Sequence, residues 1–215
     1  MLLTEHPLRN AIQHGDCIAL MQALPARSAD FILTDPPYLV RYKSRDGRSI
    51  ANDDNGHWMM PAYAEMFRVL KNDSLCVSFY GWTQTDRFIA AWRAAGFRIV
   101  GHVVFRKRYA SKARFVEYRH ESAYVLAKGQ PVLPENPPAD VIDFPYSGNR
   151  LHPTQKPVSA LKPLIEAFCP EDGVVLDPFC GSGSTLAAAR ELGRAYIGME
   201  LDNAYHRIAA DRLAA

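Results

Sequence analysis

Short apolar runs alternate along the chain with longer stretches in which apolar residues recur every three or four positions. The short runs are rich in branched and aromatic residues, which is typical of buried strands, whereas the longer spacing is typical of helices that bury one face. This pattern predicts strands at 29–34, 74–81, 97–105, 121–127, 173–177 and 194–200. It predicts helices at 57–70, 83–96, 157–168, 184–193 and 203–215.

The order of these elements predicts an α/β fold. Strands that alternate with helices indicate a mainly parallel sheet with helices on both faces. The runs at 97–105 and 121–127 have no helix between them, so we expect them to form an antiparallel pair. A chain of 215 residues is long enough for a substantial core, so we expect residues 1–215 to fold as a single domain.

Two segments interrupt the alternation. Residues 41–57 are polar and follow a stiff turn, and a loop of this length predicts a mobile flap. Residues 129–157 are rich in proline and predict an ordered but irregular excursion from the main body of the fold. No internal repeat is visible along the chain.

Composition argues against several classes of protein. Hydrophobic residues make up 48% and charged residues 22% of the chain, as in an ordinary globular protein, and the net charge of +2 gives no general signal for nucleic acid. No apolar run approaches the ~20 residues of a membrane span, and the first residues lack the apolar core of a signal peptide. The four cysteines form no CxxC pair, so we expect neither a metal site nor disulfides. We therefore expect a cytoplasmic protein.

The sequence TDPPYLV, residues 34–40, places two prolines directly after an apolar strand. Each proline lacks a backbone N–H and fixes φ at about −65°, and the residue before it is pushed out of helical space. The turn is therefore stiff, and its main chain offers carbonyl oxygens but almost no donors. With the carboxylate of Asp35 and the flat ring of Tyr38, it predicts a pocket for a group that has N–H donors and a π face.

A second candidate site surrounds VVLDPFCGSGSTLAAA, residues 174–189, which predicts a strand, a glycine loop and a helix. Ligands of open α/β sheets bind at such a loop, although the pattern is also typical of a plain strand-to-helix turn. Leu186 stands where a dinucleotide-binding fingerprint has its third glycine. Asp177 ends the strand, Glu200 ends the next strand, and Asp16 follows a third short strand. Together these carboxylates predict a pocket for an amino acid joined to a nucleoside.

The motifs resemble those of one enzyme family. DPPY and DPFCGSGST are similar to the catalytic and cofactor motifs of amino-group DNA methyltransferases that use S-adenosylmethionine. Here DPPY comes first, followed by HPTQKP, the glycine loop and YIGMELD. This order resembles the circularly permuted beta group of N6-adenine and N4-cytosine methylases, and the similarity extends from GDCIALMQALP to YIGMELDNAYHRIAADRL. The resemblance implies a Rossmann-like methyltransferase fold, S-adenosylmethionine as cofactor and double-stranded DNA as partner, and it leaves a homodimer open.

The resemblance also implies roles for individual residues. Catalysis is assigned to Asp35, Pro36, Pro37 and Tyr38, and Asp35 also borders the cofactor. The methionine end of the cofactor is assigned to Asp177, Phe179, Gly181, Ser182, Gly183, Ser184 and Thr185, and a side chain added at Gly183 would intrude on the ligand. Its carboxylate is assigned to His152, Thr154 and Lys156. Glu200 would bind the ribose hydroxyls, and Asp16 with the Cys17 backbone would bind the adenine ring.

The same residues suit methyl transfer to an exocyclic amine, which is a poor nucleophile because its lone pair is delocalised into the ring. Asp35 can accept one N–H and the Pro36 carbonyl the other, which localises the lone pair. The target base has to leave the duplex, and Tyr38 is the expected stacking platform. An aspartate at the head of the motif is typical of the adenine methylases that the chain resembles, whereas cytosine-N4 enzymes mostly begin with serine. The sequence therefore predicts N6-methyladenine as the product.

Three alternatives stay open at this stage. A cytosine-N4 methyltransferase would share the motifs. An RNA or protein amino-group methyltransferase would share the fold, but those enzymes usually carry an asparagine-led NPPY after the glycine loop. A non-catalytic nucleic-acid-binding subunit would keep the scaffold and tolerate loss of the motifs, whereas Asp35 and the glycine loop are intact here.

Basic residues cluster in two segments that are candidates for DNA contact. The stretch 106–119 interleaves aromatic rings with Arg106, Lys107, Arg108, Lys112 and Arg114. The expected flap carries Arg41, Lys43, Arg45 and Arg48. We take 106–119 and 129–152 as the candidate DNA-contacting insert, although a solvated loop between strands would have the same composition. Because the insert offers few side chains to read bases, we expect a short or relaxed target site.

Overall fold

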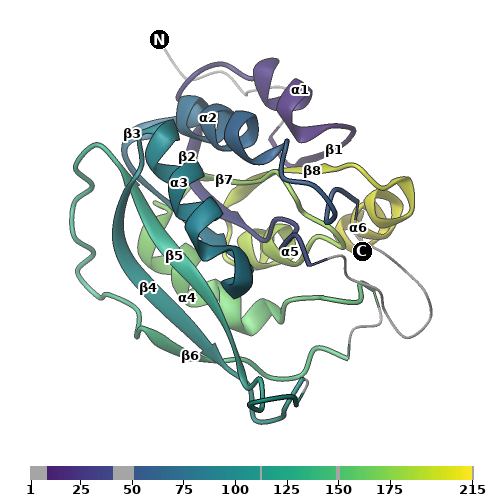
Figure 1. Ribbon diagram of the computed structural model, residues 1–215. Coiled ribbons are helices and arrows are strands. Elements are labelled where there is room, and N and C mark those ends of the chain that lie inside the picture. Colours follow the sequence, from purple (N-terminus) through teal and green to yellow (C-terminus); the bar gives the residue numbers. More distant parts are fainter. Residues whose placement is uncertain (1–8, 41–50, 112, 149–150, 215) are drawn as a thin grey trace.

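The computed structural model describes residues 9–40, 51–111, 113–148 and 151–214. In this part of the chain eight strands form one sheet, in the order β1-β8-β7-β2-β3-β5-β4-β6 (Figure 1). The strands are β1 (Ala11–His14), β2 (Ala29–Thr34), β3 (Leu70–Phe79), β4 (Arg98–Arg106), β5 (His120–Lys128), β6 (Val141–Asp143), β7 (Val174–Asp177) and β8 (Ala195–Glu200). The helices are α1 (Cys17–Gln22), α2 (Met59–Val69), a short 3-10 turn η1 (Trp82–Gln84), α3 (Thr85–Ala95), α4 (Val158–Phe168), α5 (Ser184–Glu191) and α6 (Asn203–Ala214).

One strand of the sheet runs against the others. β5 pairs antiparallel with both β3 and β4, and every other pair of neighbours is parallel. The predicted mainly parallel sheet is confirmed, and the expected antiparallel pair is β4 and β5. The edge strand β6, inside the proline-rich excursion, is absent from the sequence prediction. Three residues are too few to display an alternating pattern.

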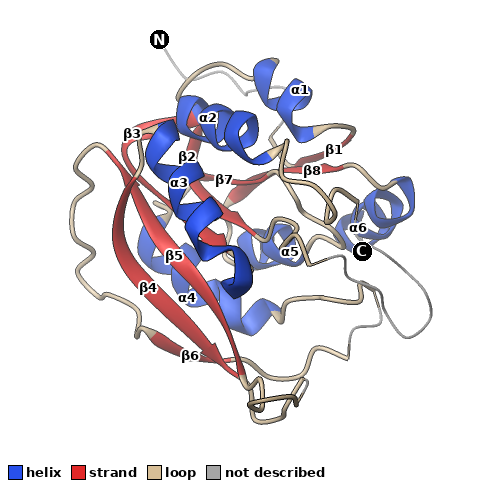
Figure 2. Ribbon diagram, in the orientation of Figure 1, coloured by secondary structure: helices blue, strands red, loops and turns tan. Residues whose placement is uncertain are grey.

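Helices cover both faces of the sheet (Figure 2). α1, α2 and α3 pack on one face, where Tyr63 and Ile32 share a core. α4 and α5 pack on the other, where Leu164 meets Phe31 and Leu33. Successive residues of a strand point to opposite faces, so a strand buried on both is mostly apolar, as β2 is at Phe31, Ile32 and Leu33. None of the helices in the described ranges is long and apolar enough to cross a bilayer.

Besides β6, the elements depart most from the prediction at α1 and at the start of β3. α1 was not predicted, because six residues are too few to show a helical period. The side chain of Asp16 caps it by accepting a hydrogen bond from the Ile18 N–H at 2.9 Å. β3 begins at Leu70, directly after α2, rather than at residue 74. Its first residues include three polar side chains, which hide the strand from a search for apolar runs.

Part of the expected flap is held against the body of the protein. Residues 41–50 lie outside the described residues, whereas 51–57 are included. Asp53 is 2% exposed, and its carboxylate accepts a hydrogen bond from the Val40 N–H at 3.3 Å. The indole of Trp58 donates to the Asn52 carbonyl at 3.2 Å. These contacts anchor one end of the segment, and its mobility stays a prediction.

The strand order reverses direction at the centre of the sheet, between β7 and β2. β2 and β7 are neighbours, but β2 continues to β3 on one side, whereas β7 continues to β8 on the other. Ligands of open α/β sheets bind at such a switch point, outside the carboxyl ends of the strands. Asp35 follows β2 at this point, and Asp177 ends β7. The fold therefore brings the two motifs together although 142 positions separate them in sequence.

Close packing between α5 and β8 explains why Leu186 can stand in place of a third glycine. Leu186 is fully buried on α5. A Cβ atom added at Gly198 of β8 would overlap the Leu186 side chain and lie 3.2 Å from the Cys180 sulfur. The glycine that permits close approach is thus on the strand rather than on the helix.

We expect Gly198→Ala to lower the free energy of unfolding by about 1–3 kcal/mol, because the added methyl overpacks this contact. Gly193→Asn is a matched control, because an added Cβ there meets nothing within 4 Å and asparagine tolerates the φ of +71°. Urea unfolding followed by tryptophan fluorescence measures both variants. Wild-type stability in Gly198→Ala would contradict the packing argument.

Candidate active site

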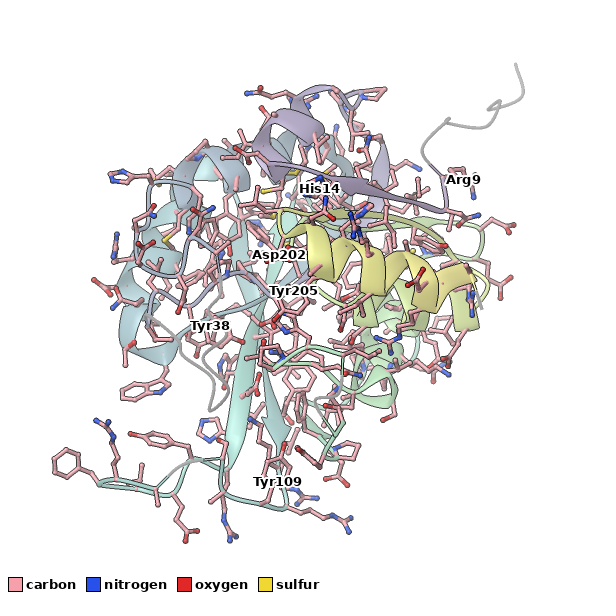
Figure 3. The ribbon with its side chains drawn as sticks, turned by 90° about the vertical axis from the view of Figure 1, so that its right-hand side faces the viewer. Arg9, His14, Tyr38, Tyr109, Asp202 and Tyr205 are labelled. Atoms are coloured by element: carbon pink, nitrogen blue, oxygen red, sulfur yellow. The ribbon has the colours of Figure 1, made fainter. Side chains whose placement is uncertain are left out.

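A cavity opens at the switch point, and it gathers every predicted catalytic and cofactor residue except one. Figure 3 shows Tyr38, Asp202 and Tyr205 around it, from the turn after β2, the loop after β8 and α6. The predicted residues on its wall are Asp16, Cys17, Asp35, Pro36, Pro37, Tyr38, His152, Thr154, Lys156, Asp177, Phe179, Gly181, Ser182, Ser184, Thr185 and Glu200.

Gly183 is the exception. It does not line the cavity, and a Cβ atom added there would point toward α6, 3.2 Å from the Cβ of Ala209. The expectation that a side chain at this position would intrude on a cavity ligand is therefore wrong. Gly183 has a φ of +77°, so it serves the turn into α5. A Cβ at Gly181, in contrast, would lie 3.6 Å from the ring of His152, which also lines the cavity.

Asp177 presents a buried carboxylate to the cavity and is 2% exposed. Its Oδ1 accepts hydrogen bonds from the Thr34 hydroxyl at 2.9 Å and from the Phe179 N–H at 3.1 Å. Burial raises the pKa of Asp177 to about 7, although these donors and the Thr185 hydroxyl favour the charged form. A carboxyl group that titrates near neutrality can lose its proton when a cationic group arrives.

Glu200 holds the backbone at the edge of the cavity. Its Oε2 accepts a hydrogen bond from the Gly181 N–H at 2.8 Å, and its Oε1 accepts one from the Asp202 N–H at 2.7 Å. Burial raises the pKa of Glu200. Each oxygen keeps a second lone pair, so the carboxylate can shape the glycine loop and still bind a ligand hydroxyl.

The proline turn is fixed by hydrogen bonds to Asp35. The Tyr38 hydroxyl donates to its Oδ1 at 2.7 Å, and the Lys156 ammonium donates to its Oδ2 at 2.6 Å. Burial and the charge of Asp35 raise the pKa of Tyr38, so the hydroxyl stays a donor. Both oxygens of the predicted catalytic carboxylate are thus already engaged by the protein.

Lys156 lies between two carboxylates rather than beside a single one. Its ammonium is 2.6 Å from Asp35 and 2.8 Å from Glu121, and its side chain is 6% exposed. Burial alone would lower the pKa of Lys156, but the two carboxylates outweigh it and raise that pKa. The sequence predicts that Lys156 binds the carboxylate of the cofactor. In the structure its ammonium already has two protein partners, so the cofactor role stays a prediction.

Glu121 was missed by sequence reasoning, and Lys107 was misassigned. The Lys107 side chain is only 8% exposed, and its ammonium lies 2.5 Å from the Glu121 carboxylate. Burial would raise the pKa of Glu121, but Lys156 and Lys107 lower it to about 2. The prediction that Lys107 contacts DNA is therefore wrong, because the paired strands β4 and β5 bury it against Glu121. A lysine within a basic stretch looks exposed in sequence, and only the strand pairing reveals its partner.

The other predicted DNA contacts fall into three groups. Arg106 and Arg108 are exposed, but their guanidinium groups lie 2.7 Å and 3.6 Å from the Asp143 carboxylate of β6. Arg114 is exposed near the tip of the β4–β5 connection. The remaining residues lie outside the described ranges: Arg41, Lys43, Arg45, Arg48 and Lys112.

Other residues of the cavity wall were also missed, among them Trp58, Asp202 and Tyr205. The ring of Trp58 lies 5.0 Å from that of Phe179, and the ring of Tyr205 lies 4.2 Å from that of His152. Trp58 and Tyr205 are nearly buried within or beside predicted helices, so their spacing marks them only as core positions. Asp202 follows Glu200 by two positions, and this acidic pair is the sequence signal that could have placed Asp202 in the cavity wall.

Comparison with known proteins identifies the family. Residues 29–148 and 143–211 match the family model described as DNA methylase. The chain belongs to this family.

Two relatives of this methylase come from Escherichia coli (strain K12). The provisionally named methylase YubD is 59% identical over 201 residues, which cover 94% of this chain and 88% of YubD. DNA adenine methyltransferase YhdJ is 31% identical over 244 residues, covering 94% of this chain and 82% of YhdJ.

Two solved methylases share the fold. The complex of M1.HpyAVI with SAM has a TM-score of 0.75 at 23% identity, covering 95% of this chain and 98% of M1.HpyAVI. The cytosine-N4-specific PvuII DNA methyltransferase has a TM-score of 0.78 at 18% identity, covering 95% of this chain and 86% of that one. The predicted methyltransferase fold is confirmed.

The methylase uses S-adenosylmethionine as its cofactor. The cavity fits this molecule electrostatically, since its described wall carries six carboxylates and a single lysine, with no arginine: Asp16, Asp35, Asp53, Asp177, Glu200, Asp202 and Lys156. Such an excess of negative charge favours a ligand that carries an ammonium and a sulfonium. Gly181 of the cavity wall has a positive φ, which glycine adopts without strain.

We expect the affinity for S-adenosylmethionine to rise between pH 5.5 and 7, by a factor approaching about tenfold per pH unit. The carboxyl group of Asp177 has a pKa of about 7 in the free protein, so at lower pH the ligand ammonium must displace its proton. Calorimetry in buffers of different ionisation enthalpy measures both affinity and proton release. Asp177→Asn should bind weakly with a flat profile, and an unchanged slope would place the titration elsewhere.

We expect Glu121→Gln to lower the free energy of unfolding at pH 7 by about 3–5 kcal/mol, because it removes the carboxylate partner of buried Lys107 and one of the two partners of buried Lys156. The pKa of Glu121 is lowered to about 2, so the advantage of the wild type is complete above the ordinary value of 4.5 and is lost as the pH falls toward 2. Urea unfolding at several pH values measures this difference.

The matched control for this prediction is Glu117→Gln. Glu117 pairs with Arg119 at 2.9 Å, but both side chains are more than half exposed. An exposed pair contributes little, so we expect a change of about 0.5 kcal/mol or less. Equal losses of unfolding free energy in the two variants would show that the buried ion pairs stabilise the protein no more than the exposed pair does.

Proposed function

We propose that this methylase transfers a methyl group to the exocyclic N6 amine of adenine in double-stranded DNA. The observation that carries the proposal is Asp35, an aspartate at the head of the proline turn and in the same cavity as the glycine loop. The relative YhdJ, named as an adenine methyltransferase, supports it. A duplex substrate requires that the target base leave the stack, because the cavity lies within the protein.

The acceptors of the turn would activate the amine. Asp35 accepts one N–H and the carbonyl of Pro36 accepts the other, which draws the nitrogen lone pair out of conjugation with the ring. These hydrogen bonds strengthen as positive charge develops on the nitrogen, so they favour the transition state over the ground state. When bound, the cofactor supplies an electrophilic methyl group. Because Pro36 and Pro37 have no N–H, no backbone donor competes for the lone pair.

The hydrogen bonds of Asp35 suggest how the base would be received. An incoming N–H takes the place of the Tyr38 hydroxyl on Oδ1, while Lys156 keeps Oδ2 in position. The released Tyr38 ring can then stack on the base, as the sequence predicts. Lys156 is already protonated between two carboxylates, so it cannot take the proton lost by the product. Asp35 is the nearest acceptor for that proton.

A cytosine-N4 methyltransferase is the main alternative. The amine of cytosine offers the same two N–H donors, so the acceptor pair alone does not choose between the bases. The similarity to the PvuII enzyme concerns the fold. Asp35 in place of the serine typical of cytosine-N4 enzymes favours adenine. A non-catalytic subunit is disfavoured because Asp35 and the glycine loop, which such a subunit could lose, are both intact.

Other features of the proposal come from the sequence. A DNA substrate and four buried cysteines that form no disulfide favour the cytoplasm. A homodimer stays open. A short or relaxed target site follows from the small number of exposed side chains available to read bases, since each specific contact supplies only about 1–3 kcal/mol of discrimination.

We expect nucleoside mass spectrometry of DNA from cells that express the protein to find N6-methyladenine. Asp35→Ala should lower the single-turnover rate by about 10² or more, as for loss of one preorganised transition-state partner. Its affinity for S-adenosylmethionine should change little, and the exposed Asp54→Ala should behave as wild type. N4-methylcytosine alone, or an active Asp35→Ala, would contradict the proposal.

A further inference from the structure

The connection between β4 and β5 forms a hairpin arm that projects beyond the end of the sheet (Figures 1 and 3). Backbone hydrogen bonds continue the strand ladder into the arm, starting with the Lys107 N–H and the Arg119 carbonyl at 2.8 Å. Farther out, Ala113 and Glu117 form an antiparallel bridge. The arm is therefore an ordered hairpin, and its tip lies between the bridged residues.

Two apolar side chains stand at this tip. Phe115 is fully exposed, and its neighbour Val116 is 61% exposed. Single exposed apolar residues are common, but an adjacent pair at the end of a projecting arm forms a small apolar surface that the described residues leave largely uncovered. Such a surface gains hydrophobic stabilisation only when another molecule buries it.

Exposed arginines accompany the apolar tip on the same arm. Arg114 precedes Phe115, and none of the ion pairs within the described ranges involves it. The Arg108 side chain is 85% exposed and lies 3.6 Å from its carboxylate partner, Asp143. Exposed pairs of this kind contribute little and can exchange for phosphate. An apolar tip on an arm that carries exposed arginines matches duplex DNA, which has anionic edges and a stacked apolar interior.

The root of the arm lies next to the proline turn. Tyr118 of the arm stacks on Trp82, with ring centroids 5.9 Å apart, and Trp82 is 65% exposed. Trp82 follows Gly81, where an added Cβ would lie only 2.6 Å from the Tyr38 carbonyl oxygen. The arm and the candidate catalytic turn therefore share one edge of the molecule.

We propose that Phe115 and Val116 form an apolar wedge that enters the base stack of duplex DNA beside the target base. The proposal rests on the proposed function and adds to it a means of replacing the stacking that the flipped base gives up. Proteins that open or kink DNA insert apolar side chains between base steps in this way. A second copy of the chain is a poorer occupant, because a twofold contact through this tip would bring like-charged arginines together.

The experiment measures single-turnover methylation of two short duplexes, centred on a site that sequencing of methylated plasmid DNA identifies. One duplex is fully paired, and the other places the target adenine opposite an abasic position, so that extrusion costs less. Phe115→Ala should lose about tenfold or more in rate on the paired duplex and be close to wild type on the abasic duplex. Phe115→Trp, which keeps an apolar ring, should be active on both.

Met60→Ala is the matched control, because Met60 is 53% exposed but lies on α2, outside both the arm and the candidate DNA-contacting insert. It should leave both rates unchanged. Equal losses of Phe115→Ala on the two duplexes, or no loss on the paired one, would overturn the wedge and leave methyl transfer standing. Dissociation of a dimer by Phe115→Ala in sedimentation would overturn it in favour of a contact between copies. A wild-type protein that methylates no DNA contradicts the proposed function itself.

Discussion

A buried ammonium requires carboxylates around it, and this requirement at Lys156 joins three distant parts of the chain. Lys156 comes from the loop before α4, Asp35 from the turn after β2, and Glu121 from the antiparallel strand β5. Removing such charges from water costs several kcal/mol per ion unless the partners are close. The position of the proline turn relative to β5 is therefore set by electrostatics as well as by packing. Displacing one member leaves the others unbalanced.

Charge is segregated between the interior and the surface, and the small net charge of +2 conceals this. The cavity is rich in acceptors, which suits both a cationic cofactor and an amine that brings only N–H donors. Exposed arginines such as Arg108 and Arg119 stand on the projecting arm, where they suit an anionic polymer. Lys107 shows how close the two regions come, because it belongs to the basic stretch in sequence but to the buried network in space.

Much of the fold and the cavity could be predicted because the deciding signals are local. The apolar run of β2, the prolines after it and the glycine loop after β7 can each be recognised from a few consecutive residues. The failures are non-local. Glu121 gains its role only through strand pairing, and Gly183 faces α6 rather than the cavity because of a backbone angle that spacing cannot reveal. β6 owes its existence to the edge of β4, not to its own three residues.

The arm has a further consequence for how methylases of this kind diversify. Its root is held by the register of β4 and β5, whereas Phe115 and Val116 at its tip are largely exposed. Insertions or exchanges at an exposed hairpin tip cost the fold little. The arm can therefore behave as an exchangeable module. A lineage could acquire a new preference among DNA contexts by replacing a few tip residues, while the sheet and its cofactor cavity pass on unchanged.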